Sequence, residues 1–462
     1  MKHTSFRLVK NGVMGLLCSA LILPITVNSQ SLEQAVAFTF DTHPDLRAAY
    51  TRFKVTEKQV DQAEAGYWPT IDATAGIGYE YTDSPSTRRS STDGTEELTR
   101  RELGLSLKQE LFSGFHTRSE VNRTSYETSA EQWTLYSTAE DLALEVSKVY
   151  IELIKAKKLV ALSEKNLASH QEIFEQIKIR TDSGFGSSAD LSQINGRLAK
   201  AHSNLIAAKN NFLDTEVAFY HLIEQQPVDL KIPYPDSDYL PKSAEEGLQI
   251  ALRNHPVIKS ANNDIESARA QYDTSKSNYY PKVSFDVDAN FDDNLDGEDG
   301  TGSPDVGGDS NEVIAMVRVS YNIFSGGRDE AYAKETAYKM SEAKELNRSV
   351  HRQVTEGFTL SWNAFEQLNQ QKEYIKMHVI AAKESQNNYK EQFKIGQRSL
   401  LDLLDTENEL YQARRDFLDA EFTEITAQYR ILHSMGLLVD ALRVTRPSTW
   451  LGEKEFNGGV TQ

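Results

Sequence analysis

The sequence contains one pattern of landmarks twice, with a constant offset of 212 residues between the copies. The matched positions are His43-Pro44 and His255-Pro256, Trp68-Pro69 and Tyr280-Pro281, Phe112-Ser113-Gly114 and Phe324-Ser325-Gly326, Gly184 and Gly396, and Asp190-Leu191 and Asp402-Leu403. A shared offset over such a length predicts two copies of one structural unit, residues 30–226 and 242–442. A linker rich in proline, aspartate and tyrosine, residues 227–241, joins the two units.

Residues 1–29 have the features of an export signal. Lys2, Arg7 and Lys10 form a positive head, and an apolar run from Gly12 to Ile25 follows them. That run is too short to span a membrane, so we expect a signal peptide that is removed by cleavage after residue 29. The only cysteine, Cys18, lies inside this segment, and the mature chain is therefore expected to contain no disulfide.

Four short segments alternate apolar and polar residues, which is typical of β-strands with one apolar face. They form two predicted hairpins with long polar tips, residues 71–81 with 103–112 and residues 283–291 with 313–324. In 283–291 every odd position is apolar and every even position is small, polar or acidic. An apolar face opposite a hydrated, negative face favours a wall between lipid and water. A half-buried strand of a soluble sandwich alternates in the same way, and this alternative stays open.

Helical patterns surround each hairpin in the same order. A short amphipathic segment opens each unit, and His-Pro then starts a helix, because proline is tolerated where no amide donor is needed. The helices after the hairpins cover residues 115–180 and 328–393, roughly 100 Å each at the α-helical rise. After a glycine-containing turn, returning helices cover residues 188–223 and 399–438, and a C-terminal tail occupies 443–462. Their many small and polar residues favour a long, thin assembly over a globular core.

Four strands in one chain leave open edges, and an open sheet edge is not stable in lipid. We therefore expect several copies of the chain to pool their strands, with three or more copies if cargo is to pass. Aromatic residues cluster at the helix-proximal ends of the strands, among them Trp68, Phe112, Tyr280 and Phe324. The cluster predicts a belt at one membrane interface, and aromatic packing at a helix–sheet junction is the alternative.

The repeated helix–hairpin–helix–turn–helix unit, the His-Pro and aromatic-Pro pairs and the Gly-x5-Asp-Leu tips together resemble the TolC family of outer-membrane channel proteins. The resemblance covers residues 31–442. It implies an α+β membrane protein, a TolC-like trimer with a shared twelve-stranded transmembrane β-barrel and a long periplasmic α-helical barrel. It also implies a position in the outer membrane of a Gram-negative cell, extending into the periplasm. The implied partners are a periplasmic adaptor (membrane fusion protein) and an inner-membrane ABC transporter or other efflux pump.

Two motifs narrow the resemblance. Gly66-Tyr67-Trp68-Pro69 and Leu111-Phe112-Ser113-Gly114-Phe115 are similar to the type I secretion branch, which exports agglutination proteins and adhesins. The predicted function is therefore the exit duct of a tripartite type I secretion system, which passively conducts an exported protein such as a large adhesin. Two alternatives stay open: the outer-membrane component of a multidrug or metal efflux pump, and a soluble periplasmic coiled-coil protein.

The resemblance also implies a periplasmic gate at the helical turns that contain Gly184 and Gly396. The residues that match the family's gate are Asp190, Phe393, Arg398, Asp402 and Asp405, with phenylalanine at 393 where a tyrosine is frequent. Copies of the last two aspartates on one axis would repel each other, so the arginine is the predicted interchain partner. Helix capping is the alternative, because Ser187 and Ser399 each precede an aspartate by three residues.

No motif in the sequence points to catalysis, a cofactor or a metal ion. The formal net charge of -18 disfavours nucleic acid as a partner. Asp292, Asn294 and Asp296 begin a calcium-loop pattern, but its twelfth position is Ser303 rather than glutamate. We therefore interpret residues 292–312 as a solvated extracellular loop. The ten histidines show no ligand spacing, and we expect a protein without enzyme activity or cofactor.

Overall fold

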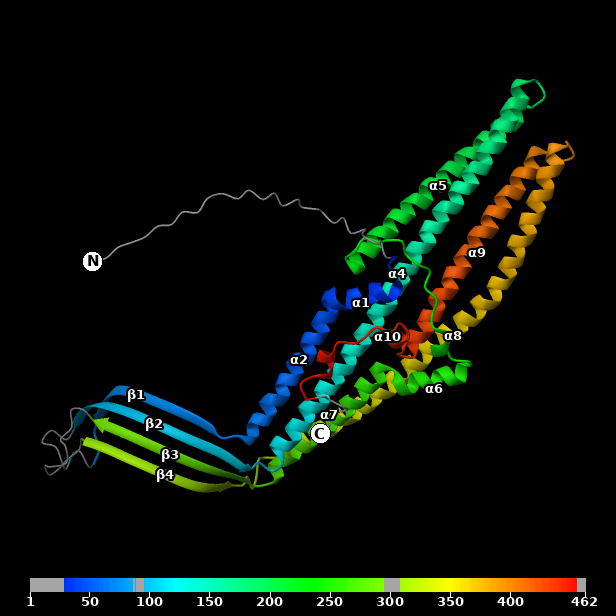
Figure 1. Cartoon of the computed structure of the whole chain (residues 1–462). Helices are drawn as coiled ribbons and strands as arrows, with labels where there is room; N and C mark the ends of the chain where they lie inside the picture. The colour runs from blue at the N-terminus through cyan, green and yellow to red at the C-terminus, as the bar shows by residue number, and fades with distance from the viewer. Residues whose placement is uncertain (1–28, 86–87, 89–94, 295–307, 455–462) are drawn as a thin grey trace, which may run out of the picture.

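The computed structural model of the chain describes residues 29–85, 88, 95–294 and 308–454. Almost all of the predicted signal segment and the centre of the predicted calcium-like loop lie outside these residues. The described chain forms an elongated molecule, with a four-stranded sheet at one end and two long helical hairpins that reach the other (Figure 1). Shorter helices lie around the middle. No helix among the described residues is long and apolar enough to cross a membrane.

The two units have the same order of elements. The first contains α1 (Leu32–Thr42), α2 (Pro44–Glu64), η1 (Ala65–Tyr67), β1 (Thr70–Thr82), β2 (Glu96–Phe112), α4 (His116–Asp182) and α5 (Ser188–Ile223). After η2 (Ser237–Tyr239), the second contains α6 (Ala244–Asn254), α7 (Pro256–Lys276), η3 (Ser277–Tyr279), β3 (Lys282–Asn294), β4 (Gly308–Ser320), α8 (Arg328–Lys394) and α9 (Leu400–Ser434). The short helices α10 (Leu438–Ala441) and η4 (Ser448–Leu451) follow.

The repeated His-Pro pair starts a helix in both units. His43 caps α2 and His255 caps α7, and in each case the ring Nδ1 accepts the backbone N–H two residues on, at 3.3 and 3.4 Å. The proline occupies the first helical position, where a missing N–H costs nothing. One local signal therefore sets the same helix start twice.

Several predicted strand boundaries are wrong, and strand pairing explains them. β3 continues to Asn294 and β4 begins at Gly308, because these two residues pair, so the ends of the predicted loop 292–312 are strand. β2 begins at Glu96 rather than at residue 103, because β1 continues to Thr82 and these two residues pair. β4 ends at Ser320 rather than at residue 324. Its partner β3 begins at Lys282, which pairs with Ser320, so the chain beyond has no neighbouring strand among the described residues.

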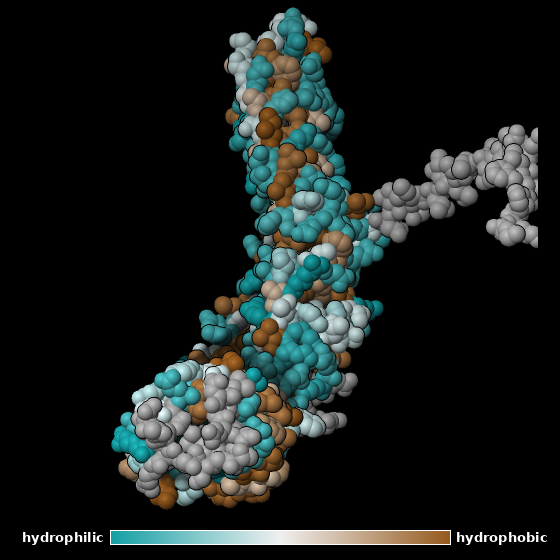
Figure 2. Space-filling model, turned by 90° about the vertical axis from the view of Figure 1, so that its left-hand side faces the viewer, coloured by the Kyte–Doolittle hydropathy of each residue, from teal (hydrophilic) through white to brown (hydrophobic). Residues whose placement is uncertain are grey.

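The register of the sheet places most apolar residues of the four strands on one face, whereas Leu98, Ile314 and Met316 lie on the other. The strands pair antiparallel in the order β1-β2-β3-β4. One row across the sheet is Ile71, Leu107, Val287 and Ala315, and the next row is Asp72, Ser106, Asp288 and Ile314. Side chains alternate between faces, so the first row lies on the apolar face and the second, with Ile314 as its exception, on the polar face. Figure 2 shows hydrophobic residues gathered along one side of this end of the molecule.

The four long helices run side by side, in the order α5, α4, α9, α8 across the arm (Figure 1). Near the middle of the molecule, α2 and α7 pack against α4. Fully buried aromatic residues, among them Tyr150, Phe219 and Phe358, form part of the core there. The Tyr150 hydroxyl lies 2.8 Å from the carbonyl oxygen of Gln30 and 2.9 Å from that of Lys231. The core therefore holds the start of the first unit beside the linker between the units.

The chain after α10 packs across the outside of the molecule, although the sequence predicted only a tail. We call residues 447–454 the C-terminal strap. Trp450 is buried, with its ring centroid 6.0 Å from that of Phe40 and 6.1 Å from that of Tyr136. The Nε2 of Gln132 in α4 donates a hydrogen bond of 2.8 Å to the carbonyl oxygen of Trp450. The strap thus connects α1 and α4.

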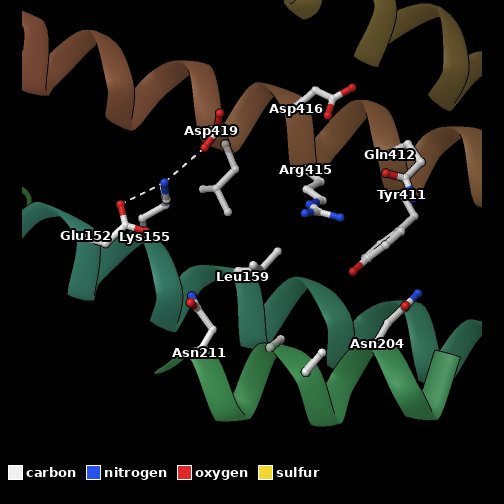
Figure 3. A pocket seen from close by; sticks show the side chains of 13 residues that line it. Glu152, Lys155, Leu159, Asn204, Asn211, Tyr411, Gln412, Arg415, Asp416 and Asp419 are labelled. Atoms are coloured by element: carbon white, nitrogen blue, oxygen red, sulfur yellow. Dashed lines mark hydrogen bonds and ion pairs between the residues drawn. The ribbon is translucent and has the colours of Figure 1, made fainter. Parts of the chain in front are cut away.

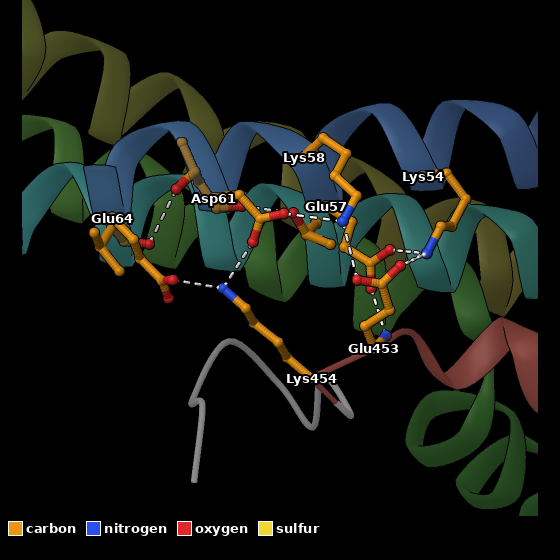
Figure 4. A network of polar contacts seen from close by, with 10 residues as sticks. Lys54, Glu57, Lys58, Asp61, Glu64, Glu453 and Lys454 are labelled. Atoms are coloured by element: carbon orange, nitrogen blue, oxygen red, sulfur yellow. Dashed lines mark hydrogen bonds and ion pairs between the residues drawn. The ribbon is translucent and has the colours of Figure 1, made fainter. Parts of the chain in front are cut away.

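Ion pairs attach the same strap to α2 (Figure 4). Glu453 accepts hydrogen bonds from Lys54 and Lys58 at 3.0 and 2.9 Å. Lys454 contacts two carboxylates near the end of α2 at 3.0 and 2.7 Å. Exposed ion pairs contribute only about 0.2–1 kcal/mol each, so most of the strap's contribution to stability comes from the buried tryptophan.

The chain turns between α9 and α10. The backbone N–H groups at the start of α10 donate hydrogen bonds to a side chain of the first unit. The predicted helix 399–438 ends at Ser434, because Gly436 has a φ of +68° that breaks the helical path. The carboxylate of Glu140 in α4 accepts the N–H groups of Leu438 and Val439 at 2.8 and 3.3 Å. A negative charge at a helix N-terminus is favourable, so Glu140 joins α4 to α10.

The Glu140 carboxyl is held inside the protein, with only 2% of the residue exposed. Burial raises the pKa of Glu140 to about 7, although the charges of Arg446 and His433 and the two backbone donors oppose the shift. The Nη2 of Arg446 lies 3.4 Å from this carboxylate. Glu140 therefore changes its protonation near neutral pH.

Trp450→Ala is expected to weaken the fold. Removing a buried tryptophan typically costs about 3–5 kcal/mol, because lost burial and a residual cavity add together. We expect a clear drop in the thermal unfolding temperature of the purified protein in detergent. Trp68→Ala is the matched control, because Trp68 is 74% exposed. Equal unfolding temperatures for the two variants would contradict a structural role for the strap.

Glu140→Gln is expected to change how stability depends on pH. The unfolded carboxyl has an ordinary pKa of 4.5, so the folded protein binds the proton more tightly. The resulting stability is fully present below pH 4.5 and is lost as the pH rises through 7, a change of roughly 3 kcal/mol. His255 acts in the opposite direction, because burial and the charge of His433 lower its pKa to about 4.

The comparison of Glu140→Gln with the wild type isolates the Glu140 contribution, since both retain His255. Thermal unfolding measured between pH 5 and pH 8 should show the wild type losing stability relative to the variant as the pH rises. The amide keeps an oxygen that accepts the backbone N–H groups. A difference that stays constant over this range would refute the effect.

Candidate functional site at the helical tip

The two helical turns farthest from the sheet lie at the same end of the arm (Figure 1). Gly184 has a φ of +80° and Gly396 a φ of +79°, a conformation that glycine adopts without the steric cost of a side chain. Each turn is followed by a serine cap. The Ser187 Oγ accepts the N–H of Ala189 at 3.1 Å, and the Ser399 Oγ accepts the N–H of Asp402 at 3.2 Å.

The predicted capping box is present in the second turn only. The carboxylate of Asp402 accepts the N–H of Ser399 at 3.2 Å, which completes the reciprocal pair. In the first turn Ser187 bonds to residue 189, and Asp190 lies half-buried in the first turn of α5 without completing a box. Asp402 is therefore a cap residue whose carboxylate is engaged within its own chain.

Arg398, in the turn between α8 and α9, lies against the end of α8. Its guanidinium carbon is 4.4 Å from the centroid of the Tyr389 ring, and its Nε donates a hydrogen bond of 3.0 Å to Gln392. Within the described residues it makes no ion pair with either predicted constriction aspartate. The side chain is exposed, so it is accessible from outside the chain.

Phe393 belongs to the apolar core of the tip. It is 7% exposed and packs in a cluster with residues of both hairpins: Ile173, Ile177, Ile194, Leu400, Leu403 and Leu404. The guanidinium carbon of Arg180 lies 5.5 Å from the centroid of its ring. The phenylalanine thus joins the α4–α5 hairpin to the α8–α9 hairpin.

The structure adds one residue that sequence reasoning missed. Arg197 in α5 contacts Asp405 in α9, with Nη2 2.8 Å from Oδ1. Arg197 stands two helical turns after Asp190, so its position near the tip was visible in the sequence. Its partner was not, because the two residues meet only when the hairpins pack side by side.

The Arg197–Asp405 pair is the end of a longer line of contacts, which we call the seam between the hairpins. Glu172 contacts Lys390 at 3.2 Å, and the hydroxyls of Ser163 and Tyr411 lie 3.1 Å apart. Nearer the middle of the molecule, Lys155 of α4 contacts Asp419 of α9 at 3.1 Å. The seam therefore combines a small apolar core at the tip with polar contacts along the helices.

A groove of about 510 Å³ opens in the seam beside Lys155 (Figure 3). Lys155 closes one end, where it contacts Glu152 at 2.9 Å as well as Asp419. Arg415 points into the groove from α9, with Leu159 opposite on α4. Its walls are mainly polar, so the hairpins are not sealed together by an apolar core at this level.

The predicted aromatic belt lies at the base of the sheet. The Phe115 ring makes edge contacts with Phe112 and Tyr280, at centroid distances of 5.2 and 5.5 Å. Trp68 and Phe324 are strongly exposed. Both interpretations of the belt therefore have support here, since part of the cluster packs at the helix–sheet junction and part faces outward.

No group of three or more histidine, cysteine, aspartate or glutamate side chains is placed to hold a metal ion in the part of the chain that the structure describes.

The architecture indicates the class of outer-membrane export channels. It joins a four-stranded sheet that is apolar on one face to a pair of long helical hairpins with narrow tips.

The chain belongs to the outer membrane efflux protein family, whose model matches residues 40–224 and 247–437. It is 24% identical over 438 residues to the outer membrane efflux protein BepC of Brucella suis, covering 94% of this chain and 92% of BepC. It is 20% identical over 405 residues to the outer membrane protein TolC of Escherichia coli, covering 86% of this chain and 80% of TolC.

A solved structure with the same fold is the channel protein CusC. It superposes with a TM-score of 0.77 at 14% identity, covering 88% of this chain and 92% of CusC. The resemblance to the TolC family is therefore confirmed, and with it the α+β fold and the outer-membrane location. The relatives are channel proteins, and this chain is an outer-membrane export channel.

Proposed function

We propose that three copies of this chain form the exit duct of a tripartite type I secretion system. The observation that carries the proposal is the sheet, which is apolar on one face, acidic and hydrated on the other, and ends in two outer strands. Each outer strand has one edge that pairs with no other described strand, and four strands do not close alone. Three copies placed edge to edge give a closed twelve-stranded barrel with the apolar face toward lipid.

The helical arm supports the same assembly. α5 and α8 lie on its two flanks, and both carry exposed large apolar side chains: Ile206, Leu213, Val217 and Tyr220 on α5, and Leu360, Tyr374, Met377 and Ile380 on α8. The spacings are seven, four and three residues on α5 and fourteen, three and three on α8, and both sets suit helix-to-helix packing. A ring in which α5 of one copy meets α8 of the next buries both flanks in a closed, head-to-tail contact.

The polar face of the sheet supports a water-filled passage. Its acidic residues are Asp72, Glu80, Glu102, Glu110, Asp286, Asp288, Asp292 and Glu312, and its basic residues are Arg100, Lys108, Lys282 and Arg318. This acidic excess, multiplied by three copies, disfavours anionic cargo and favours cations and water. The passage needs no energy source of its own, so partner proteins supply the energy for transport.

The proposed partners are a periplasmic adaptor and an inner-membrane ABC transporter, and the proposed cargo is an exported protein such as a large adhesin. The motifs at residues 66–69 and 111–115 support this branch of the family. The alternative is the outer-membrane component of a multidrug or metal efflux pump, and the similarity to BepC, an outer membrane efflux protein, favours it.

A gene deletion separates the two functions. The secretion duct predicts loss of an exported surface protein, measured by proteomics of the culture fluid and cell surface, with unchanged sensitivity to toxic compounds. The efflux alternative predicts the reverse. Complementation with the wild-type gene should restore the affected phenotype, and unchanged export in the deletion strain would exclude the secretion proposal.

Leu213→Glu is expected to break the trimer. Leu213 is 57% exposed in one chain but lies in the proposed α5–α8 contact, where a buried unpaired charge is strongly unfavourable. Native mass spectrometry in detergent should show monomers in place of trimers. Val55→Glu is the matched control, since Val55 is equally exposed on α2, away from the flanks. A Leu213→Glu trimer as stable as the control would count against the proposed contact.

Arg197→Ala and Asp405→Ala are expected to loosen a gate at the tip. Exposed ion pairs contribute about 0.5 kcal/mol each, so three copies would shift a closed–open equilibrium by roughly tenfold. Single-channel recordings in planar bilayers should show more frequent or larger openings for both variants. The reversed pair, Arg197→Asp with Asp405→Arg, should restore wild-type conductance.

Two further variants sharpen this measurement. Arg398→Ala tests the predicted interchain contact, because its guanidinium makes no ion pair with the described residues of its own chain. Arg348→Ala removes an exposed ion pair of 2.7 Å with Glu345 far from the tip and is the control. If all tip variants conduct like the control, these residues do not form a gate.

A further inference from the structure

A second cavity, of about 500 Å³, lies beside the C-terminal strap, away from the tip and the seam. We call it the α7–α10 pocket, and its lining includes Trp133, Tyr136, Lys259, Asp440 and Arg446. It is formed by α4, the start of α7, α10 and the strap. Its volume is within the range of sites for small molecules.

A glycine makes this pocket possible. A Cβ atom on Gly436 would lie 2.7 Å from the Cδ of Pro256 and 2.9 Å from the Cα of His255. The turn between α9 and α10 therefore approaches the start of α7 more closely than any other residue type would allow. This approach brings Asp440 and the strap to the same side of α7 as Lys259.

Lys259 is a cation without an anionic partner. Its Nζ lies 4.2 Å from the centroid of the Trp133 ring, a favourable cation–π contact. No carboxylate of the described residues lies within 4.0 Å of it. Among the described residues that line the pocket, Arg446 is the one other cation, so two positive groups face one cavity.

The acids nearby are already engaged. Asp440 contacts the Nη1 of Arg446 at 2.5 Å, and Glu140 accepts the backbone donors of α10. The Nε of Arg446 is buried and has no hydrogen-bond partner among the described residues. The carboxylates nearest the pocket therefore pair with groups other than Lys259.

The pKa of Lys259 agrees with its lack of an ion-pair partner. Burial lowers the pKa of Lys259, the charge of Arg446 lowers it further, and Asp440 only partly opposes the shift. A half-buried ammonium that no carboxylate contacts is stabilised by a bound anion.

We propose that the α7–α10 pocket binds a small anion, whose carboxylate or phosphate group sits against the Nζ of Lys259. The site is independent of transport through the duct, because its residues belong to neither the tip nor the polar face of the sheet. Its ligand links α4, α7 and the strap, and so couples the two units at the middle of the molecule.

The test uses the full-length protein in detergent at constant ionic strength, with sodium chloride as the balancing salt. Inorganic phosphate and citrate are titrated separately while tryptophan fluorescence and the thermal unfolding temperature are recorded. A saturable response in the wild type that is lost in Trp133→Phe assigns the fluorescence change to this pocket. A response to either anion supports the proposal and identifies the preferred group.

Lysine variants decide whether the charge is responsible. A charge-assisted hydrogen bond is worth roughly 10- to 100-fold in affinity, so Lys259→Gln should weaken binding by at least about tenfold, while Lys259→Arg should retain it. Lys276→Gln is the matched control, since Lys276 lies on the same helix, 3.9 Å from the centroid of the Tyr272 ring, outside the pocket. Equal binding by Lys259→Gln and the control, or no saturable response to either anion, overturns the proposal.

Discussion

The pairing of β2 with β3 is the constraint on which the rest of the structure depends, because it joins the two units into one sheet. Leu103 faces Phe291 and Leu107 faces Val287 in this pairing, so the apolar faces of both hairpins coincide. A shift of one residue would turn one hairpin over and mix apolar and acidic side chains on each face. The common apolar face in turn requires lipid on one side and water on the other.

The middle of the molecule holds the long arm to this sheet. Contacts there connect distant parts of the chain: Glu140 of α4 caps α10, and Trp450 of the strap packs against Phe40 and Tyr136. These contacts are buried, whereas the seam toward the tip combines a small apolar core with exposed ion pairs worth about 0.2–1 kcal/mol each. The largest cluster of buried contacts therefore lies at the middle of the molecule rather than at the tip.

The sequence predicted local features well and contacts between hairpins poorly. Ser399 and Asp402 form the capping box that their spacing indicated, since capping depends on four consecutive residues. The partner of Asp405 was not predictable, because Arg197 lies on a helix of the other unit. Phe393, predicted at the gate, lies in the apolar tip core, where its neighbours come from both hairpins. The C-terminal tail became a packed strap for the same reason.

The sequence by itself determined the duplication, the four alternating strands, the helix starts at His-Pro and the family, because each of these is written in neighbouring residues or in a repeated spacing. Only the tertiary structure decided where β2 begins and β4 ends, which acid meets which base along the seam, and that Lys259 faces a cavity beside Arg446. These features depend on the register of paired strands and on the close packing of segments about two hundred or more residues apart, and no local pattern encodes the distance between two such side chains.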